Sequence, residues 1–298
     1  MPDNDRPSQP PAQTSSNRWS SIFALPGPLR ELFNHFPLIT YAANPLPAGT
    51  NALPSSSENA LYIFATPSDA SRGLPSLNPT CLKHQTYLRL KGVEVRTIVS
   101  NNHASPSGSL PFLLPTKGAK AVPASGLRKW AEGGTPYPAQ AKLDVHLALL
   151  DHRLRRAWLY QLYLDPANVP ALSRLYLETA SSVEVVRYVT HAQLRKAAGE
   201  ELRNSSGPAG VEEAELLAQG VEALGALNEL LSSGGGTWFS SEDEPGWLDA
   251  AVFAYTGPLL DRRMEWARNG LGDALKDMDA LMRHRQGIAK RCGWDDTL

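Results

Sequence analysis

The feature that most constrains the fold is the order of short apolar runs between residues 61 and 114. The first run has the length and composition of a strand, and Asn78 with Pro79 opens an amphipathic helix. A second strand-like run follows, and a proline then sets the first backbone position of a third. The expected elements are residues 61–65, 78–92, 93–99 and 112–114, the last of them preceded by Pro111. The predicted order is strand, helix, strand, X-Pro, strand.

This order is that of a thioredoxin-like domain, in which thiol enzymes carry their nucleophile at the N-terminus of the first helix. That position is Asn78, a good helix cap but no nucleophile. Cys81 lies one turn further in without a partner cysteine, so we interpret it as a small buried residue, with a reactive thiol as the alternative. The fold class also predicts a cis peptide between Leu110 and Pro111.

Two further departures separate this half from a glutathione transferase, the enzyme class with this arrangement. Transferases usually have Glu-Ser after the fourth strand, whereas the matching place here is Ala124-Ser125, without the carboxylate. They also have a helix between strands two and three, but residues 100–109 are a loop of Asn, Ser and Pro in which no normal helix fits. Asn78, Cys81, Pro111 and Ser125 therefore line a vestigial cleft.

Composition sets bounds on class and partners. The 298 residues, 42% of them hydrophobic, are enough for two domains with real cores. A formal net charge of −1 gives no electrostatic reason to expect nucleic-acid binding. Cys81 and Cys292 are the only cysteines, which excludes a disulfide framework. We find no His or Cys spacing for a metal, no phosphate-binding loop and no nucleophile elbow, so no cofactor, metal or catalytic residue is predicted.

The N-terminal 60 residues have little globular pattern. Residues 1–20 are proline-rich and are predicted to be a disordered tail without a targeting presequence, and no run is long and apolar enough to cross a bilayer. Residues 21–60 form an N-terminal extension with a short helix near residues 28–33. This arm either packs on its own domain or docks on a partner. The candidates for partner docking are Phe23, Leu29, Phe33 and Phe36.

After the thioredoxin-like domain, residues 61–132, and a linker at 133–138, the chain is predicted to be helical from 139 to 298. Apolar residues at helical spacing run from Leu143 to Leu162. The expected helices are 139–164, 171–199 and 211–231, with breaks at 204–210 and 232–236. The fold class is therefore α/β plus all-α, glutathione-transferase-like.

Asp249 follows Gly246 by three positions at the start of a buried helix, residues 245–255. An acidic residue there can accept hydrogen bonds from the N–H groups of its own cap, so we interpret Asp249 as a structural capping residue. Near the C-terminus lies a basic cluster, Arg283, Arg285, Lys290 and Arg291. Its simplest interpretation is a solvated helix face, and the alternative is contact with anionic lipid headgroups.

Four segments together resemble the metaxin family: residues 74–82, 87–92, 105–111 and 248–255. The proline-rich start, with Pro28-Leu-Arg-Glu-Leu-Phe33, is similar to that of the smaller metaxin-like subunit of the fungal mitochondrial sorting and assembly machinery (the SAM complex). The resemblance implies a peripheral protein on the cytosolic face of the mitochondrial outer membrane. It implies three kinds of partner: a β-barrel insertase core, a second metaxin-like subunit and β-barrel precursors with a C-terminal sorting signal.

The resemblance therefore favours a non-catalytic subunit that helps to recognise and insert β-barrel precursors. Two alternatives remain at this point. One is a glutathione-transferase-like enzyme that uses Cys81 or Ser125, which the Asn78 cap disfavours. The other is a soluble adaptor with the same fold, which would co-purify with cytosolic partners.

Overall fold

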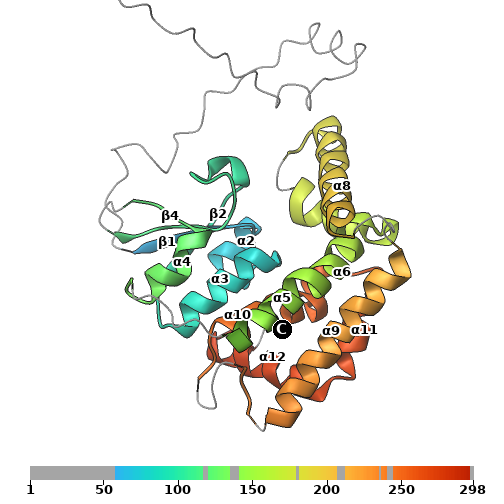
Figure 1. Ribbon diagram of the computed structural model, residues 1–298. Coiled ribbons are helices and arrows are strands. Elements are labelled where there is room, and N and C mark those ends of the chain that lie inside the picture. The colour runs from blue at the N-terminus through green and yellow to red at the C-terminus, as the bar shows by residue number, and fades with distance from the viewer. Residues whose placement is uncertain are drawn as a thin grey trace, which may run out of the picture. The chain divides into compact units, whose positions relative to one another are not determined.

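A four-stranded sheet and a set of helices meet along helix α3 in the computed structural model (Figure 1). The structure describes residues 58–116, 120–134, 141–178, 181–206, 212–234, 236–239 and 244–295. All of these belong to one unit, residues 46–298. Residues 1–57, which include the predicted tail, the arm and its docking candidates Phe23, Leu29, Phe33 and Phe36, lie outside the described part of the chain.

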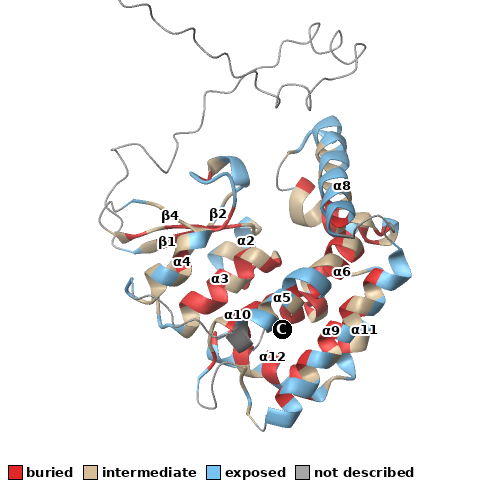
Figure 2. Ribbon diagram, in the orientation of Figure 1, coloured by how far each residue is buried: buried red, intermediate tan, exposed pale blue. Residues whose placement is uncertain are grey.

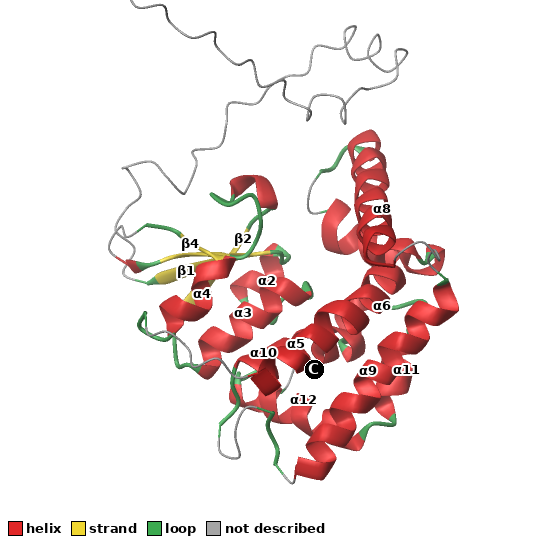
Figure 3. Ribbon diagram, viewed as in Figure 1, coloured by secondary structure: helices red, strands yellow, loops and turns green. Residues whose placement is uncertain are grey.

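The sheet, whose strands are yellow in Figure 3, has the strand order β2-β1-β3-β4. Strand β1 pairs in parallel with β2, with Asn59 opposite Val95, and antiparallel with β3, with Tyr62 opposite Phe112. Those two rings stack with centroids 4.3 Å apart. The strands are β1 (Asn59–Ile63), β2 (Val95–Val99), β3 (Phe112–Leu114) and β4 (Val122–Pro123). Mixed pairing of this kind arises because the β1–β2 connection crosses over through a helix, as predicted.

Two helices, α3 (Pro79–Leu90) and α4 (Ala124–Ala131), pack on the sheet. Cys81 and Leu88 of α3 and Leu127 of α4 lie in one buried cluster with Leu61 and Phe112. The short helix α2 (Pro67–Ser71) follows β1, and the connection from β2 to β3 holds only the 3-10 turn η1 (Asn102–Ala104) within the described residues. No helix of normal length was expected in this loop, which is confirmed.

The helical part begins with a nearly continuous run that alternates α- and π-helical turns: α5 (Ala141–Leu149), η3 (Leu150–Leu154), α6 (Arg155–Leu159) and η4 (Tyr160–Leu164). Next come η5 (Pro166–Asn168), α7 (Val169–Leu172), η6 (Ser173–Leu177) and α8 (Glu184–Ser206). The remaining elements are α9 (Glu213–Gly234), α10 (Trp247–Leu260), η7 (Arg262–Met264), α11 (Gly270–Lys276) and α12 (Asp279–Arg291). The prediction of one helix over residues 171–199 is wrong, because the helix is interrupted after Leu177 and α8 continues to Ser206.

Helix α10 is the centre of the helical part. It is buried along nearly its whole length and packs against both α3 and α12 (Figure 2). Phe253 and Ala254 share a buried cluster with Leu82 of α3 and with Ile288 and Trp294 of the C-terminal segment. A helix that is apolar all round must be covered on every side. The sheet side and the helical side are therefore parts of one packed structure.

Candidate functional site

The first turn of α3 is the place where a thiol enzyme of this fold would do its chemistry. Asn78 caps the helix, since its Oδ1 accepts the Cys81 backbone N–H at 3.0 Å. Its Nδ2 donates to the Tyr176 hydroxyl oxygen at 2.8 Å, and its own backbone N–H donates to Ser76 Oγ. Both ends of the Asn78 amide are thus engaged within the protein, and the position has no group that can attack a substrate.

Tyr176 comes from η6 of the helical part and covers this turn. Its ring lies edge-on to Phe64 at 5.3 Å and stacks on Tyr163 at 6.0 Å. Burial, together with the neighbouring Tyr163, holds the pKa of Tyr176 well above its ordinary value, so the phenol is neutral at physiological pH. We call Phe64, Tyr163 and Tyr176 the aromatic plug. Through the Tyr176 hydroxyl, this group is bonded directly to the cap residue of α3.

Cys81 is fully buried behind the Asn78 cap. Burial raises the pKa of its thiol to about 12, even though the Phe64 backbone and the Ser76 hydroxyl act to lower it. The other cysteine, Cys292, is also buried, and burial raises its pKa to about 12. The thiolate is the reactive form of cysteine, so neither side chain has the environment of a nucleophile.

The other two predicted cleft residues take no part in the Asn78 hydrogen bonds. The Leu110–Pro111 peptide is cis, which confirms the prediction. Pro111 is buried, and the Leu110 N–H beside it donates to Asn102 Oδ1 at 3.0 Å, so this backbone donor is also used internally. Ser125 is exposed on the first turn of α4, whose N-cap, Pro123, makes no side-chain capping bond.

Asp249 caps α10 as predicted, and it also bonds to residues outside this helix. One carboxylate oxygen accepts the Gly246 N–H at 2.8 Å, which closes the capping box. The other accepts the Phe239 N–H at 2.8 Å and lies 3.1 Å from Nε2 of His284 on α12. Asp249 and His284 are both fully buried. The carboxylate therefore joins α10, the preceding loop and α12.

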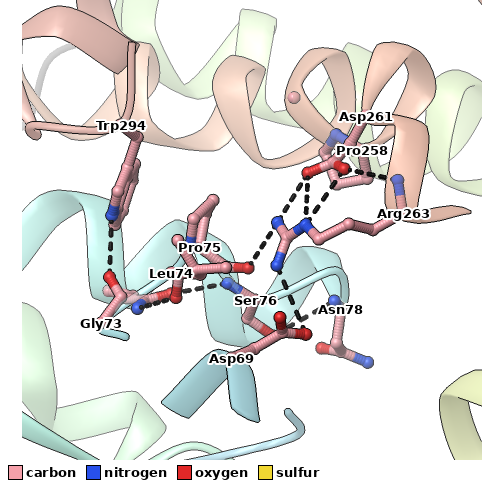
Figure 4. Close-up of polar contacts among 12 residues, drawn as sticks. Asp69, Gly73, Leu74, Pro75, Ser76, Asn78, Pro258, Asp261, Arg263 and Trp294 are labelled. Carbon is pink, nitrogen blue, oxygen red and sulfur yellow. Dashed lines mark hydrogen bonds and ion pairs between the residues drawn. The ribbon is translucent and has the colours of Figure 1, made fainter. Parts of the chain in front are cut away.

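The loop before α3 is held by the C-terminal helices (Figure 4). Arg263 donates to the Pro75 carbonyl at 3.0 Å, pairs with Asp261 at 2.6 Å and lies 3.4 Å from Asp69. On the other side, Trp294 Nε1 donates to the Gly73 carbonyl at 3.0 Å. These contacts fix the Asn78 turn relative to the helical part from two directions.

The basic cluster corrects one expectation. Arg283, Lys290 and Arg291 are exposed, but Arg285 is buried and donates to the carbonyls of Thr256 at 3.1 Å and Gly257 at 3.4 Å. Carbonyls in the last turn of a helix lack intrahelical partners, so a cation is favoured there. Arg285 therefore belongs to the packing at the C-terminal end of α10 and not to a solvated face.

The first two turns of α8 carry a feature that sequence reasoning missed. Within the described residues, most of the large apolar side chains that are exposed lie here, and the upper end of α8 is pale blue in Figure 2. Tyr188 is 75% exposed, Val185 58% and Val189 39%. We call this surface the α8 patch: Val183, Val185, Val186, Tyr188 and Val189. The run of valines was visible in the sequence, but spacing alone does not reveal which side a helix buries.

Two other kinds of feature are absent from the part of the chain that the structure describes. They contain no group of His, Cys, Asp and Glu side chains placed to hold a metal ion. None of their helices combines the length and the apolar composition needed to cross a bilayer.

Two family models and several known proteins match this chain. The family model for the glutathione S-transferase N-terminal domain matches residues 79–168, and that for the C-terminal domain matches residues 220–288. Metaxin-3 of Xenopus laevis is 28% identical over 195 residues, which is 63% of each chain. Metaxin-1 of Macaca fascicularis is 28% identical over 236 residues, 74% of this chain and 69% of the relative. The chain is similar to metaxins over most of its length.

The match to metaxin-3 spans less than two thirds of that relative's length. Solved structures support the fold. The β-etherase LigF of Sphingobium sp. strain SYK-6 aligns with a TM-score of 0.51 and 17% identity, covering 80% of this chain and 97% of its own. A glutathione S-transferase of Ceriporiopsis subvermispora, solved with glutathione, aligns with a TM-score of 0.51 and 15% identity, covering 78% and 97%. The fold is therefore glutathione-transferase-like.

Residues 169–219 are matched by neither transferase family model. We call them the intervening segment. It contains α7, η6 and α8, and so provides both Tyr176 of the aromatic plug and the α8 patch. The hydroxyl that meets Asn78 and the exposed α8 patch thus come from one stretch of sequence.

Proposed function

We propose that this chain is a non-catalytic peripheral subunit of the mitochondrial outer membrane machinery that recognises and inserts β-barrel precursors. Similarity to metaxins supports a role in protein import at that membrane. The observation that carries the non-catalytic part is the Asn78–Tyr176 hydrogen bond, because it closes the thiol position with groups of the protein itself. The proposed location is the cytosolic face of the membrane.

The proposed partners are a β-barrel insertase core, a second metaxin-like subunit and β-barrel precursors. Contiguous exposed apolar surface favours partner binding, and the α8 patch is such a surface. Its surroundings favour a protein over anionic lipid. A helix that lies on lipid is rich in Lys and Arg and inserts large apolar side chains, whereas α8 mixes acidic Glu184 and Glu200 with basic Arg187 and Lys196 and offers mainly valines.

The arm candidates Phe23, Leu29, Phe33 and Phe36 remain predictions for a second contact with the same partners. The alternative of a soluble adaptor uses the same surfaces but different partners. The alternative of a glutathione-dependent enzyme would need the aromatic plug to move away from Asn78.

Affinity purification from detergent-solubilised mitochondria tests the proposal. We expect a β-barrel outer membrane protein and a second metaxin-like chain to co-purify with this chain in stoichiometric amounts. In a separate extraction of outer membranes, alkaline carbonate should release at least part of the chain. Recovery of cytosolic partners only would favour the adaptor. Saturable heat on titration with millimolar glutathione would favour the enzyme, and either result would overturn the proposal.

A further inference from the structure

A cavity of about 450 Å³ lies on a different face of α3 from the aromatic plug. Thr80 and Lys83 of α3 line it together with residues of α5, η3, α6, α8 and α10, and no residue of the plug takes part. Lys83 follows Cys81 by two positions, which places the two side chains about 200° apart around the helix axis. The size is within the range of small-ligand sites, about 300–1,000 Å³. Pro79, which follows Asn78, also lines the cavity, but neither Asn78 nor any residue of the aromatic plug does.

Much of the cavity wall is apolar. Leu147 and Leu150 line it from one side, and Trp247, Ala251 and Ala254 of α10 line it from the other. Leu150 and the two alanines are buried, so they belong to the packed structure and hold this wall in place. Such a surface favours the apolar body of a ligand.

The charged side chains that line the cavity differ in whether another residue of the protein already pairs with them. Arg155 makes a two-pronged ion pair with Glu201, at 2.8 and 3.2 Å. Burial alone would lower the pKa of Arg155, but the bonds to Glu201 raise it above its ordinary value, so this cation is fully engaged. Lys83 is half-buried, and its ammonium lies over the Trp247 ring at 5.0 Å without a hydrogen bond to any residue that the structure describes. Burial lowers the pKa of Lys83.

The balance of charge indicates how many negative charges a ligand can bring. Three cations line the cavity, Lys83, Arg155 and Arg156, against the two carboxylates of Asp151 and Glu201. One additional negative charge balances the set. A doubly charged phosphate would exceed that balance and would face both carboxylates at short range.

We propose that this cavity binds a monocarboxylate with an apolar body, with the Lys83 ammonium pairing the carboxylate and the α10 wall holding the apolar part. Two sources share this chemistry: the C-terminus of a peptide that ends in an apolar residue, and a free aromatic or aliphatic acid. A charge-assisted bond to Lys83 supplies the selectivity for the acid over its neutral amide.

Isothermal titration with an acetylated tripeptide, Ala-Leu-Phe, tests the proposal in the whole chain. We expect the free-acid form to bind saturably and the C-terminal amide at least about 10-fold more weakly, a difference of about 1.4 kcal/mol. Lys83→Met should abolish this preference. Lys129→Met is the matched control, because Lys129 is exposed on α4 and does not line the cavity. This variant should keep the preference.

Titration with 3-phenylpropionate distinguishes the sources. Binding as tight as that of the peptide favours a free acid, and markedly weaker binding favours a peptide terminus. Equal affinity for acid and amide in the unaltered chain, no binding of either at millimolar concentration, or a preference retained by Lys83→Met would each overturn the proposal. The comparison of acid with amide needs no variant, so it holds even if Lys83→Met fails to fold. Because no membrane component takes part, the result is independent of the proposed function.

Discussion

Two valines show how α10, in a region that a transferase family model matches, differs from the start of α8, in the intervening segment. Val252 of α10 is fully buried, whereas Val185 of α8 is 58% exposed. Full burial of such a side chain contributes about 1.5–3 kcal/mol to folding, a gain that Val185 largely forgoes. Val252 and the other buried apolar residues of α10 therefore help to hold the fold together. Those on the outer side of α8 are not needed for that purpose and are available to a partner.

Tyr176 links the two regions. It lies in the intervening segment, yet its hydroxyl accepts a hydrogen bond from Asn78, which caps α3 directly before the first matched region. The same segment that offers an apolar surface outward thus also bonds to the cap of α3. The comparison predicts that changes in the matched regions alter stability or reactivity, and that changes in the α8 patch alter binding.

The largest expected effect concerns the thiols. With a pKa of about 12, Cys81 and Cys292 should react with Ellman's reagent at pH 8 more than about 1,000-fold more slowly than an ordinary thiol. Both pKa values are raised, so the thiols stay protonated as the pH rises from 7 to 10 and reactivity should remain low. Two thiols should react at once in denaturant. Fast labelling of Cys81 in the native chain would mean that the site is open.

Asp249→Ala should have the largest effect on stability. The change removes the α10 cap, leaves the partly buried N–H groups of Gly246 and Phe239 without their acceptor and takes the partner from buried His284, which should cost about 3 kcal/mol or more. Urea unfolding followed by circular dichroism measures it. Asp273→Ala, at an exposed ion pair with Lys276, is the control and should stay within about 0.5 kcal/mol. Similar values for both variants would contradict the role given to Asp249.

Two glycines of α9 should respond with opposite signs. A Cβ at Gly220 would lie 2.4 Å from Ala157 Cβ and 2.8 Å from Leu271 Cδ2, so Gly220→Ala should destabilise by about 1–3 kcal/mol. A Cβ at Gly225 meets nothing within 4 Å, so Gly225→Ala should stabilise by about 0.5–1 kcal/mol through helix propensity. Thermal unfolding of the pair checks the close approach of α9 to α6. A gain in stability for Gly220→Ala would show that the contact is loose.

Tyr176→Phe tests the link between the two regions. It removes the hydroxyl that accepts from Asn78 and should cost about 1 kcal/mol, with the rings of the aromatic plug still in place. Tyr188→Phe removes a hydroxyl from the same segment at a residue that is 75% exposed and should cost almost nothing. Equal effects in chemical denaturation would indicate that the Asn78 bond contributes no stability.

Local chemistry explains what the sequence could predict. Asn78 with Pro79 and Gly246 with Asp249 are cap patterns, and the contacts that define a cap lie within one helical turn. The cis bond at Pro111 followed from the order of elements around it. Each of these predictions needed only neighbours in the sequence or the fold class.

The features that sequence reasoning missed depend on distant contacts. Tyr176 meets Asn78 across 98 positions, and no pattern near either residue signals the pairing. Arg285 looked like a solvated cation, because the carbonyls of Thr256 and Gly257 that hold it belong to another helix. The break after Leu177 has no glycine or proline beside it. The α8 patch was missed because a helical pattern gives the spacing of apolar residues but not which of them find a packing partner.

The most direct test of the account uses the double variant Val185→Ser and Val189→Ser. Tagged chains are purified from solubilised mitochondrial outer membranes, and the co-purified proteins are quantified by mass spectrometry. The control is Gln193→Ser with Ala197→Ser, two exposed positions further along the same helix. We predict a several-fold loss of partner recovery for the valine variant only, with its free energy of unfolding changed by less than about 0.5 kcal/mol. Full recovery of partners, or unfolding of the valine variant, would contradict the claim that this helix serves binding and not the fold.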